Sequence, residues 1–222
     1  MRTGYVVTGT DTGIGKTLVS AALCHAFTQQ GKHVAALKPV ASGCEVTAEG
    51  LRNADALMLA RYCDPLLDYE DINPVALQEA CAPHIAAQKM GVNIEFDTIL
   101  QEFARLADTH DVIIVEGAGG WHVPLNDTHS MVDLISAMQL PVIMVVGMRL
   151  GCLNHALLTA QAVHAAGLTL SGWIANRCAA DFANCQENID YLISHLSAPL
   201  LADIPYQQTP DPETVAGMIQ LS

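Results

Sequence analysis

The sequence predicts an α/β fold in which a mostly parallel sheet is covered by helices on both faces. Short apolar runs alternate with longer amphipathic runs, which is typical of parallel strands joined by crossover helices. Residues 112–115 form a continuous apolar run, as expected of a strand that is buried on both faces. Residues 5–14 lead through a glycine-rich turn into a Gly-Lys-Thr triplet (15–17), which is typical of a phosphate-binding loop, or P-loop. We therefore predict a single P-loop domain over residues 1–222.

The expected strands are short runs rich in Val, Ile, Leu and Ala, most of them followed by glycine or polar residues. In chain order they are Tyr5–Thr8, Val34–Leu37, Val112–Glu116, Val142–Val146, Leu170–Ala175 and Leu200–Ile204. The expected helices are longer runs with apolar residues at helical spacing. In chain order they are Thr17–Gln30, Leu51–Tyr62, Ile94–Ala107, Met131–Met138, Cys152–Ala166, Gln186–His195 and Pro212–Ile219. Residues 64–83 contain three prolines and are expected to be the least regular segment.

The amino-acid composition indicates which classes of binding partner and which cellular compartment to expect. The chain of 222 residues has 23 Asp and Glu against 10 Lys and Arg, a formal net charge of −13. Such an acidic surface repels nucleic acid and anionic lipid, so we expect neither nucleic acid nor a membrane as a partner. Seven cysteines without Cys-x-x-Cys spacing, together with the lack of a recognisable signal peptide, predict a cytoplasmic protein. The most apolar region, residues 140–168, is interrupted by polar and charged residues and is not expected to span a bilayer.

The P-loop is one residue longer than the general pattern Gly-x4-Gly-Lys-[Ser/Thr]. The first glycine of that pattern would be residue 10, but the chain has Thr10 there and Gly9 one position earlier. Lys16 would neutralise the terminal phosphates, and the hydroxyl of Thr17 would bind Mg²⁺. The pattern leaves open a strand-to-helix turn without a ligand, in which Lys16 is solvated and Thr17 only belongs to the first helical turn.

Charged residues also follow or end other expected strands, where ligands bind in parallel sheets. Lys38 precedes a proline that fixes the backbone, and its ammonium would lie near the γ-phosphate if the second strand neighboured the first. Glu116 ends a run of Val and Ile, and a buried carboxylate there needs a partner such as Mg²⁺. Asp55 is a candidate second carboxylate for the metal, although a solvated helix face suits it equally. Lys38 could instead be a surface residue, and Glu116 could accept backbone N–H groups of the glycine turn.

Two further segments are candidates for substrate recognition. Residues 151–155 begin an expected helix, whose free N–H groups would hold a carboxylate without a basic side chain. His155 within it suits a structural hydrogen bond better than catalysis. Asn176 lies in Asn-Arg-Cys-Ala rather than in the guanine-selecting pattern Asn-Lys-x-Asp, so we expect its amide to bind the edge of an adenine.

A series of motifs spans nearly the whole chain. They are Gly9-Thr10-Asp11-Thr12 with Gly15-Lys16-Thr17, residues 38–43 (KPVASG), 50–57 (GLRNADAL), 73–74 (NP), 115–121 (VEGAGGW), 150–156 (LGCLNHA) and 172–176 (GWIAN). In this order the motifs resemble those of the dethiobiotin synthetase family, in which the long P-loop is also found.

The resemblance implies ATP- and Mg²⁺-dependent carboxylation of 7,8-diaminononanoate by CO₂ and ring closure to dethiobiotin, in biotin biosynthesis. One amine would form a carbamate, ATP would phosphorylate it, and the second amine would displace phosphate. The family also implies a homodimer, in which residues 151–154 of one subunit receive the carboxylate tail of the substrate that is bound by the other.

Residue roles follow from the same resemblance. The implied catalytic residues are Lys16, Lys38 and Thr12, and the implied metal ligands are Thr17, Asp55 and Glu116. The residues implied at ATP are Gly13, Ile14, Gly15, Lys16, Thr17, Leu18, Asp55, Glu116, Gly117, Ala118, Gly119, Asn176, Arg177, Pro205, Tyr206 and Gln207. The residues implied at the diamine and its carboxylate are Thr12, Ser42, Gly151, Cys152, Leu153 and Asn154.

Two positions depart from some members of that family. Some carry Glu at the position of Gly13, and some carry a Tyr that holds the substrate carboxylate at the position of Asn188, whereas here Tyr191 is the nearest tyrosine. The rival functions are a regulatory P-loop ATPase switch and a nucleotide-binding paralogue without a role in biotin synthesis. Switch proteins usually carry a lysine five residues before the loop lysine, where this chain has Asp11, and this difference argues against them.

Overall fold

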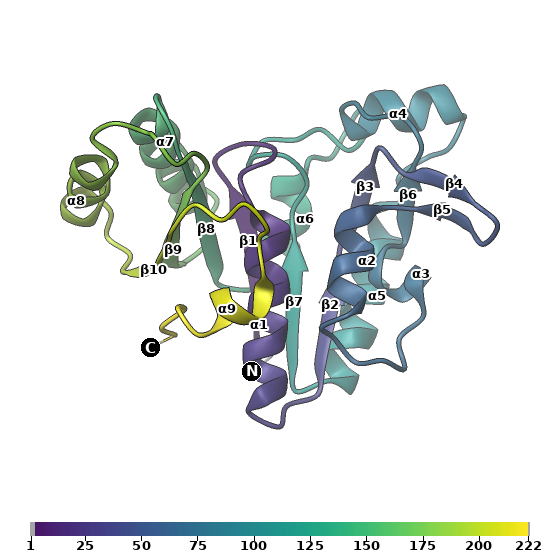
Figure 1. Ribbon diagram of the computed structural model, residues 1–222. Helices are drawn as coiled ribbons and strands as arrows, with labels where there is room; N and C mark the ends of the chain where they lie inside the picture. The colour runs from purple at the N-terminus through teal and green to yellow at the C-terminus, as the bar shows by residue number, and fades with distance from the viewer. Residues whose placement is uncertain (1–2, 222) are drawn as a thin grey trace.

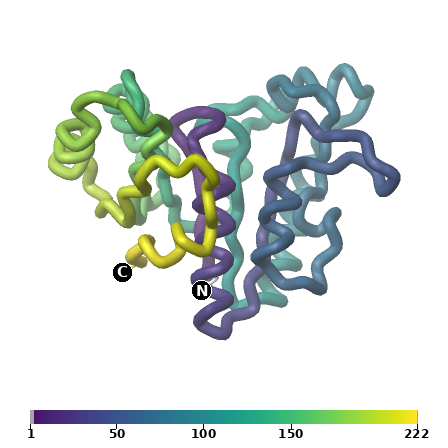
Figure 2. Tube along the Cα trace, viewed as in Figure 1, coloured from purple at the N-terminus to yellow at the C-terminus, as the bar shows by residue number. Residues whose placement is uncertain are grey.

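The computed structural model describes residues 3–221, whose path Figure 2 traces, and contains a sheet of six parallel strands (Figure 1). The strands are β1 (Gly4–Gly9), β2 (Val34–Leu37), β7 (Val112–Glu116), β8 (Val142–Met148), β9 (Leu170–Arg177) and β10 (Leu200–Ile204). Their order across the sheet is β10-β9-β8-β1-β7-β2. The predicted α/β class and all six predicted strands are confirmed, and β8 and β9 each extend two residues further than predicted.

Helices cover both faces of this sheet (Figure 1). The helices α1 (Lys16–Gln29), α2 (Ala54–Ala60) and α9 (Pro212–Ala216) pack in one apolar cluster, and α5 (Phe96–Thr109), α6 (Met131–Met138), α7 (Cys152–Ala165) and α8 (Cys185–His195) pack in another. Successive strand residues divide between the clusters, since Val6 belongs to one and Val7 to the other, and both are buried. Burial of both faces explains why these strands are continuously apolar.

A smaller substructure follows β2 and contains elements that the sequence did not reveal. Strands β3 (Val40–Ser42) and β6 (Val75–Leu77) pair in parallel, and β4 (Glu45–Thr47) pairs with β5 (Gly50–Arg52) as a hairpin. The helices α3 (Tyr69–Ile72) and α4 (Pro83–Met90) complete this part of the chain. Residues 64–83, predicted to be the least regular segment, contain the short elements α3 and β6.

The prediction of a helix over Leu51–Tyr62 was wrong at both ends. Leu51 lies in β5, and the helix begins only after Asn53, whose side-chain oxygen accepts hydrogen bonds from the backbone N–H groups of Asp55 and Ala56 at 3.0 and 3.4 Å. Asparagine at this position satisfies donors that have no partner within the helix. This cap fixes Asp55 in the first turn of α2, where its carboxylate accepts a hydrogen bond from Lys38.

The carboxyl ends of the six strands meet at one edge of the sheet, where the P-loop joins β1 to α1 (Figure 1). Lys38 was expected to lie near the γ-phosphate if the second strand neighboured the first. That condition was wrong, because β7 lies between β1 and β2. Glu116 ends β7 and therefore lies between the P-loop and Lys38. Among residues 3–221, no helix combines the length and apolar character needed to span a bilayer.

Candidate functional site

The backbone of the P-loop requires glycine at position 15. Gly15 has φ of 93° and directly precedes α1. A Cβ atom added at this residue would lie 2.3 Å from Nδ2 of Asn176, so no other residue fits without displacing that side chain. Gly13 also has a positive φ, but a Cβ atom there would meet nothing. The loop is further joined to β8 by a hydrogen bond from the N–H of Thr10 to the carbonyl of Val145 at 3.0 Å.

Lys16 is buried at the start of α1 rather than solvated. The residue is only 6% exposed, and its Nζ donates a hydrogen bond to the carbonyl oxygen of Asp11 at 2.8 Å. Burial, followed by the nearby charge of Lys38, lowers the pKa of Lys16 to about 8. The amine is therefore held inside the loop, and no carboxylate of residues 3–221 forms an ion pair with it, which suits a residue that binds an anion.

Lys38 is almost completely buried between two carboxylates. Its Nζ lies 2.6 Å from Oε1 of Glu116 and 2.9 Å from Oδ2 of Asp55, and its side chain is 5% exposed. Burial alone would lower the pKa of Lys38, but the two carboxylates outweigh burial and raise the pKa above its ordinary value. Lys38 thus remains a cation at neutral pH, and the prediction that it could be a surface lysine does not fit its burial.

Backbone and side-chain contacts hold Lys38 in place. Its N–H donates to the carbonyl of Ile72 at 2.7 Å, and its carbonyl accepts from Nδ2 of Asn73 at 2.8 Å. The hydroxyl of Tyr69 donates to Oδ1 of Asn73 at 3.0 Å and accepts from the N–H of Asn53 at 2.8 Å. Asn73 and Tyr69 were not assigned roles from the sequence, because a hydrogen-bond network between separate elements leaves no local spacing signal.

Glu116 has the donor atoms and the unmet bonding capacity of a magnesium ligand. It is completely buried; Oε1 accepts from Lys38 and from the hydroxyl of Thr17 at 2.9 Å, whereas Oε2 has no hydrogen-bond partner among residues 3–221. A buried carboxylate oxygen without a partner is costly unless a cation or a donor reaches it. Burial would raise the pKa of Asp55, but the charge of Lys38 and its hydrogen bonds outweigh burial and lower it, so Asp55 is ionised. Oxygen ligands of this kind suit Mg²⁺.

A cavity of about 550 Å³ opens beside Lys38 and is called the Lys38 cavity here. Its polar lining residues include Thr12, Lys38, Ser42, Asn53 and Asp55. The remaining lining residues are mostly small or apolar, namely Val40, Ala41, Ala80, Cys81, Ala82, Pro83, Ala118, Gly119, Gly120, His122, Val123 and Pro124. The lining therefore offers both polar and apolar contacts to a ligand.

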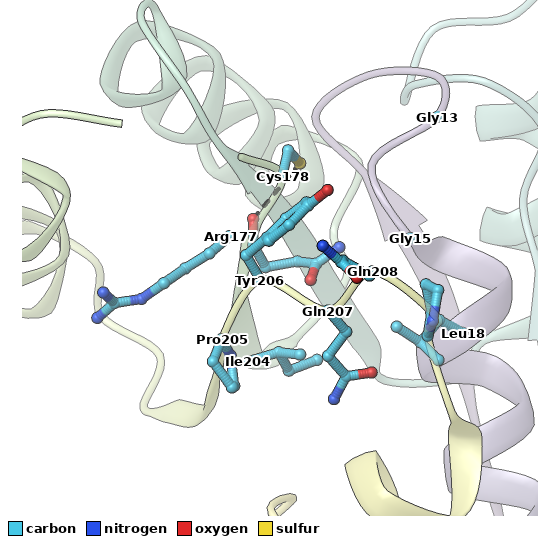
Figure 3. Close-up of a pocket in the computed structure, with 12 residues that line it drawn as sticks. Gly13, Gly15, Leu18, Arg177, Cys178, Ile204, Pro205, Tyr206, Gln207 and Gln208 are labelled. Atoms are coloured by element: carbon cyan, nitrogen blue, oxygen red, sulfur yellow. Dashed lines mark hydrogen bonds between the residues drawn. The ribbon is translucent and has the colours of Figure 1, made fainter. Parts of the chain in front are cut away.

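A second cavity, of about 290 Å³, lies on the other side of the P-loop and is called the Asn176 cavity (Figure 3). It is lined by Gly13, Gly15, Leu18, Asn176, Arg177, Cys178, Ile204, Pro205, Tyr206, Gln207, Gln208 and Pro210. Nδ2 of Asn176 donates to the carbonyl of Ile14 at 2.7 Å, which fixes the orientation of the amide. Figure 3 shows the guanidinium of Arg177 directed away from the other labelled residues, and it pairs with Asp203 at 2.6 Å.

The structure divides the residues predicted at ATP between several places. Gly13, Gly15, Leu18, Asn176 and the segment 205–207 line the Asn176 cavity. Ala118 and Gly119 line the Lys38 cavity instead, with the predicted substrate residues Thr12 and Ser42. Gly117 contributes a backbone hydrogen bond to Val7 at 3.0 Å beside the loop. Lining residues such as Cys81, Pro83 and His122 were missed, because they belong to loops whose path the sequence does not reveal.

The predicted carboxylate-binding segment, residues 151–154, lines neither of these cavities within one chain. It forms the first turn of α7, preceded by Gly151 with φ of 94°. Asn188, where some relatives were expected to have tyrosine, lies in α8 close to this turn, with its Oδ1 3.9 Å from Sγ of Cys152. Tyr191 is one turn further along α8, where its ring stacks on His195 at 3.8 Å between centroids.

Comparison with known proteins gives one consistent result. A family model described as an AAA domain matches residues 3–214. An ATP-dependent dethiobiotin synthetase of Xanthomonas axonopodis pv. citri (strain 306) is 48% identical over 217 residues, covering 98% of this chain and 97% of that protein. A protein of the same description from Nitrosospira multiformis is 47% identical over 222 residues, covering 100% of this chain and 96% of that protein.

Solved structures with similar folds are more distant in sequence. A ParA family ATPase from Chlorobium tepidum has a TM-score of 0.60 at 16% identity, covering 94% of this chain and 86% of that chain. A chain of the MinC:MinD cell division complex of Aquifex aeolicus has a TM-score of 0.57 at 17% identity, covering 93% of this chain and 82% of that chain. At this identity the likeness establishes the P-loop fold and no shared activity.

Proposed function

The chain belongs to the family of ATP-dependent dethiobiotin synthetases, and from this membership we propose that Lys16, Lys38 and Glu116 form its reaction centre. It is an ATP-dependent ligase of biotin biosynthesis that closes a ring, and the relatives do not favour a switch ATPase or a paralogue without this role. The observation that supports the residue roles best is the contact of buried Lys38 with Glu116 at 2.6 Å, beside the P-loop.

The proposed reaction takes place where the P-loop meets the Lys38 cavity. One amine of 7,8-diaminononanoate adds to CO₂ and forms a carbamate, which the ammonium groups of Lys16 and Lys38 stabilise. A carbamate oxygen then attacks the γ-phosphorus of ATP, so that ADP leaves and a carbamic–phosphoric anhydride forms. The second amine attacks the carbonyl carbon, the C–O bond to phosphate breaks, and the cyclic urea of dethiobiotin is complete. Thr12 and Ser42 line this cavity and would orient the diamine and carbamate.

A magnesium site is proposed at Thr17, Asp55 and Glu116. The unpartnered Oε2 of Glu116 and the ionised Asp55 support it. Within residues 3–221, no group of three or more His, Cys, Asp and Glu is arranged to hold a metal, so hydroxyl, phosphate and water oxygens would have to complete the coordination. A bound Mg²⁺ would neutralise the β- and γ-phosphate oxygens. The protein's own part is to hold the two carboxylates and the Thr17 hydroxyl at fixed positions.

Adenine is proposed to lie in the Asn176 cavity. Because Nδ2 of Asn176 is already bonded to the carbonyl of Ile14, its Oδ1 is the atom left to accept from the exocyclic amine of adenine. Guanine has a carbonyl oxygen at the corresponding position and would place two acceptors against each other. The segment 205–207, with the ring of Tyr206, would supply the wall on which the base lies.

The proposed active form is a homodimer in the cytoplasm. Residues 151–154 do not reach the Lys38 cavity of their own chain, and the family resemblance assigns them to the substrate of the other subunit. The neighbouring Leu150 is 94% exposed in one chain, which fits a surface that a second copy covers. All seven cysteines are free thiols, which fits a reducing compartment.

The proposed function is tested by ADP release from the purified protein. ATP, Mg²⁺, bicarbonate and the diamine are supplied together, and each is then omitted in turn. We expect ADP release and dethiobiotin formation only with the complete mixture. Hydrolysis of ATP that does not depend on the diamine would instead favour a switch ATPase.

Glu116→Gln is expected to raise the Mg²⁺ concentration needed for half-maximal activity. The amide keeps one oxygen but removes the charge that attracts the cation, and magnesium prefers carboxylates. The measurement is an Mg²⁺ titration of ADP release at fixed ATP. Glu79→Gln is the matched control, because Glu79 pairs with Lys89 on the surface and lines neither cavity. A titration curve for Glu116→Gln that overlays the wild-type curve would remove Glu116 from the proposed metal site.

ATP affinity is expected to fall as the pH rises above about 8. In the unliganded protein the Lys16 amine is protonated below its pKa of about 8 and neutral above it, whereas the phosphates require the ammonium form. Binding above that pH therefore takes up a proton, and the dissociation constant rises by up to about tenfold per pH unit. Below that pH this group adds no pH dependence. Calorimetry in buffers of different ionisation enthalpy measures the uptake directly, and no uptake at pH 9 would contradict the assignment.

A further inference from the structure

An ion pair joins the P-loop to the end of a neighbouring strand. The carboxylate of Asp11 pairs through Oδ2 with the guanidinium of Arg149, which follows β8 and is 138 residues away in the sequence. Both side chains are nearly half exposed, at 43% and 48%. In a single chain, an ion pair this exposed contributes little to stability. Its expected contribution to folding is therefore small, and its position at the P-loop needs another explanation.

Asp11 contacts two residues that the proposed function places in the reaction centre. Its Oδ1 accepts a hydrogen bond from the N–H of Thr12 at 2.7 Å, and its carbonyl oxygen accepts from Nζ of Lys16 at 2.8 Å. The Thr12 hydrogen bond, with the charge of Arg149 in addition, lowers the pKa of Asp11, so the carboxylate stays ionised at neutral pH. A movement of Asp11 would therefore displace both Thr12 and Lys16.

Arg149 in turn contacts the start of α7. Its carbonyl oxygen accepts a hydrogen bond from the N–H of Cys152 at 3.0 Å, which closes the turn before that helix. Its side chain reaches back to Asp11. Arg149 therefore touches both the loop that is proposed to bind phosphate and the helix start that is proposed to bind the substrate carboxylate.

We propose that the Asp11–Arg149 ion pair positions the P-loop against the start of α7, with Arg149 acting through Asp11 on Thr12 and Lys16. Arg149 is in this sense a positioning residue of the reaction. The expected effect on catalysis rests on the proposed function, whereas the expected effect on the position of the P-loop does not. A misplacement of reacting groups by about 1 Å costs up to ~10²-fold in rate. A variant that still folds but has a loosened P-loop is expected to lose part of this factor in rate.

The test compares the single variants Arg149→Gln and Asp11→Asn, their double variant, and Arg149→Lys. The matched control is Arg105→Gln, which removes ion pairs with Asp71 and Glu102 that involve neither the P-loop nor α7, with the Arg105 side chain 47% exposed. We expect Arg149→Gln and Asp11→Asn each to lower kcat about tenfold, with an unchanged melting temperature. The double variant should lose no more than either single variant, since both break one interaction. Arg149→Lys should regain most of the loss, and Arg105→Gln should match the wild type.

A second readout does not require turnover. Hydrogen exchange of the peptide that covers residues 8–17 should be faster in Arg149→Gln and in Asp11→Asn, because the Thr12 N–H loses its fixed acceptor. It should be unchanged in Arg105→Gln. If the wild type shows no diamine-dependent ADP release, the proposed function fails, and this exchange experiment still decides on the ion pair. Unchanged exchange in Arg149→Gln, or losses of kcat that multiply in the double variant, would overturn the proposal.

Discussion

Lys38→Ala is expected to lower kcat by at least about 10²-fold, or ~2.7 kcal/mol, which is typical for loss of a preorganised group that stabilises charge in the transition state. The reason is that Lys38 is a buried cation held at a fixed point, with Nζ 2.6 Å from Glu116 and 2.9 Å from Asp55. The ammonium of Lys38 is already in place, so it does not have to move when negative charge develops on the carbamate and on the transferred phosphoryl group. The measurement is steady-state ADP release with saturating ATP and diamine, and a loss below threefold would refute the role of Lys38.

Loss of Lys38 also changes stability, so a control must separate the two effects. The substitution leaves the fully buried carboxylate of Glu116 without its cation, which costs ~3–5 kcal/mol when one member of a buried pair is removed. Lys38→Ala combined with Glu116→Gln removes both charges and should regain much of that stability. We expect the double variant to melt closer to the wild type and to stay as inactive as Lys38→Ala. Recovery of activity together with stability would show that Lys38 only supports the fold.

Lys16→Ala is expected to lower kcat/KM by at least about 10²-fold, since the ammonium at the P-loop contributes to both phosphate binding and turnover. Lys16 is buried and donates to the backbone carbonyl of Asp11, and within residues 3–221 it forms no ion pair, so its removal leaves none of those carboxylates without an ion-pair partner. A much smaller change in melting temperature than for Lys38→Ala is therefore expected. In calorimetry, Lys16→Ala should weaken the binding of ATP more than the binding of ADP, because the terminal phosphate is the group that loses its counter-charge.

Lys32→Ala provides the control for Lys16→Ala. Lys32 follows α1 at its other end and is exposed. It should keep wild-type kcat and ATP affinity. An equal loss in both lysine variants would indicate a general effect of net charge, and a loss below threefold in Lys16→Ala would refute its role.

The sheet and the P-loop were predictable because their signals are local. Strands buried on both faces are continuously apolar, and the loop combines glycines with Gly-Lys-Thr at a fixed spacing. The short strands after β2 were missed because three residues give no measurable period. The start of α2 was misplaced because apolar Leu51 continues the helical pattern backwards, while its pairing in the β4–β5 hairpin is set by contacts outside that pattern.

The reaction centre was predicted as a set of residues but not as an arrangement. The sequence placed Lys38 and Glu116 at strand ends, yet only the strand order shows that β7 inserts Glu116 between Lys38 and the P-loop. The hydrogen bonds of Asn73 and Tyr69 behind Lys38 and the pairing of Asp11 with Arg149 connect distant parts of the chain. Such contacts depend on tertiary packing, and no spacing within one segment encodes them.

The most direct test of the central claim is a crystal structure with Mg²⁺ and a non-hydrolysable ATP analogue. The account predicts that the terminal phosphate lies within hydrogen-bond distance, about 3 Å, of Nζ of both Lys16 and Lys38, with the base beside Asn176. A triphosphate bound elsewhere, or a Lys38 ammonium directed away from the terminal phosphate, would contradict it.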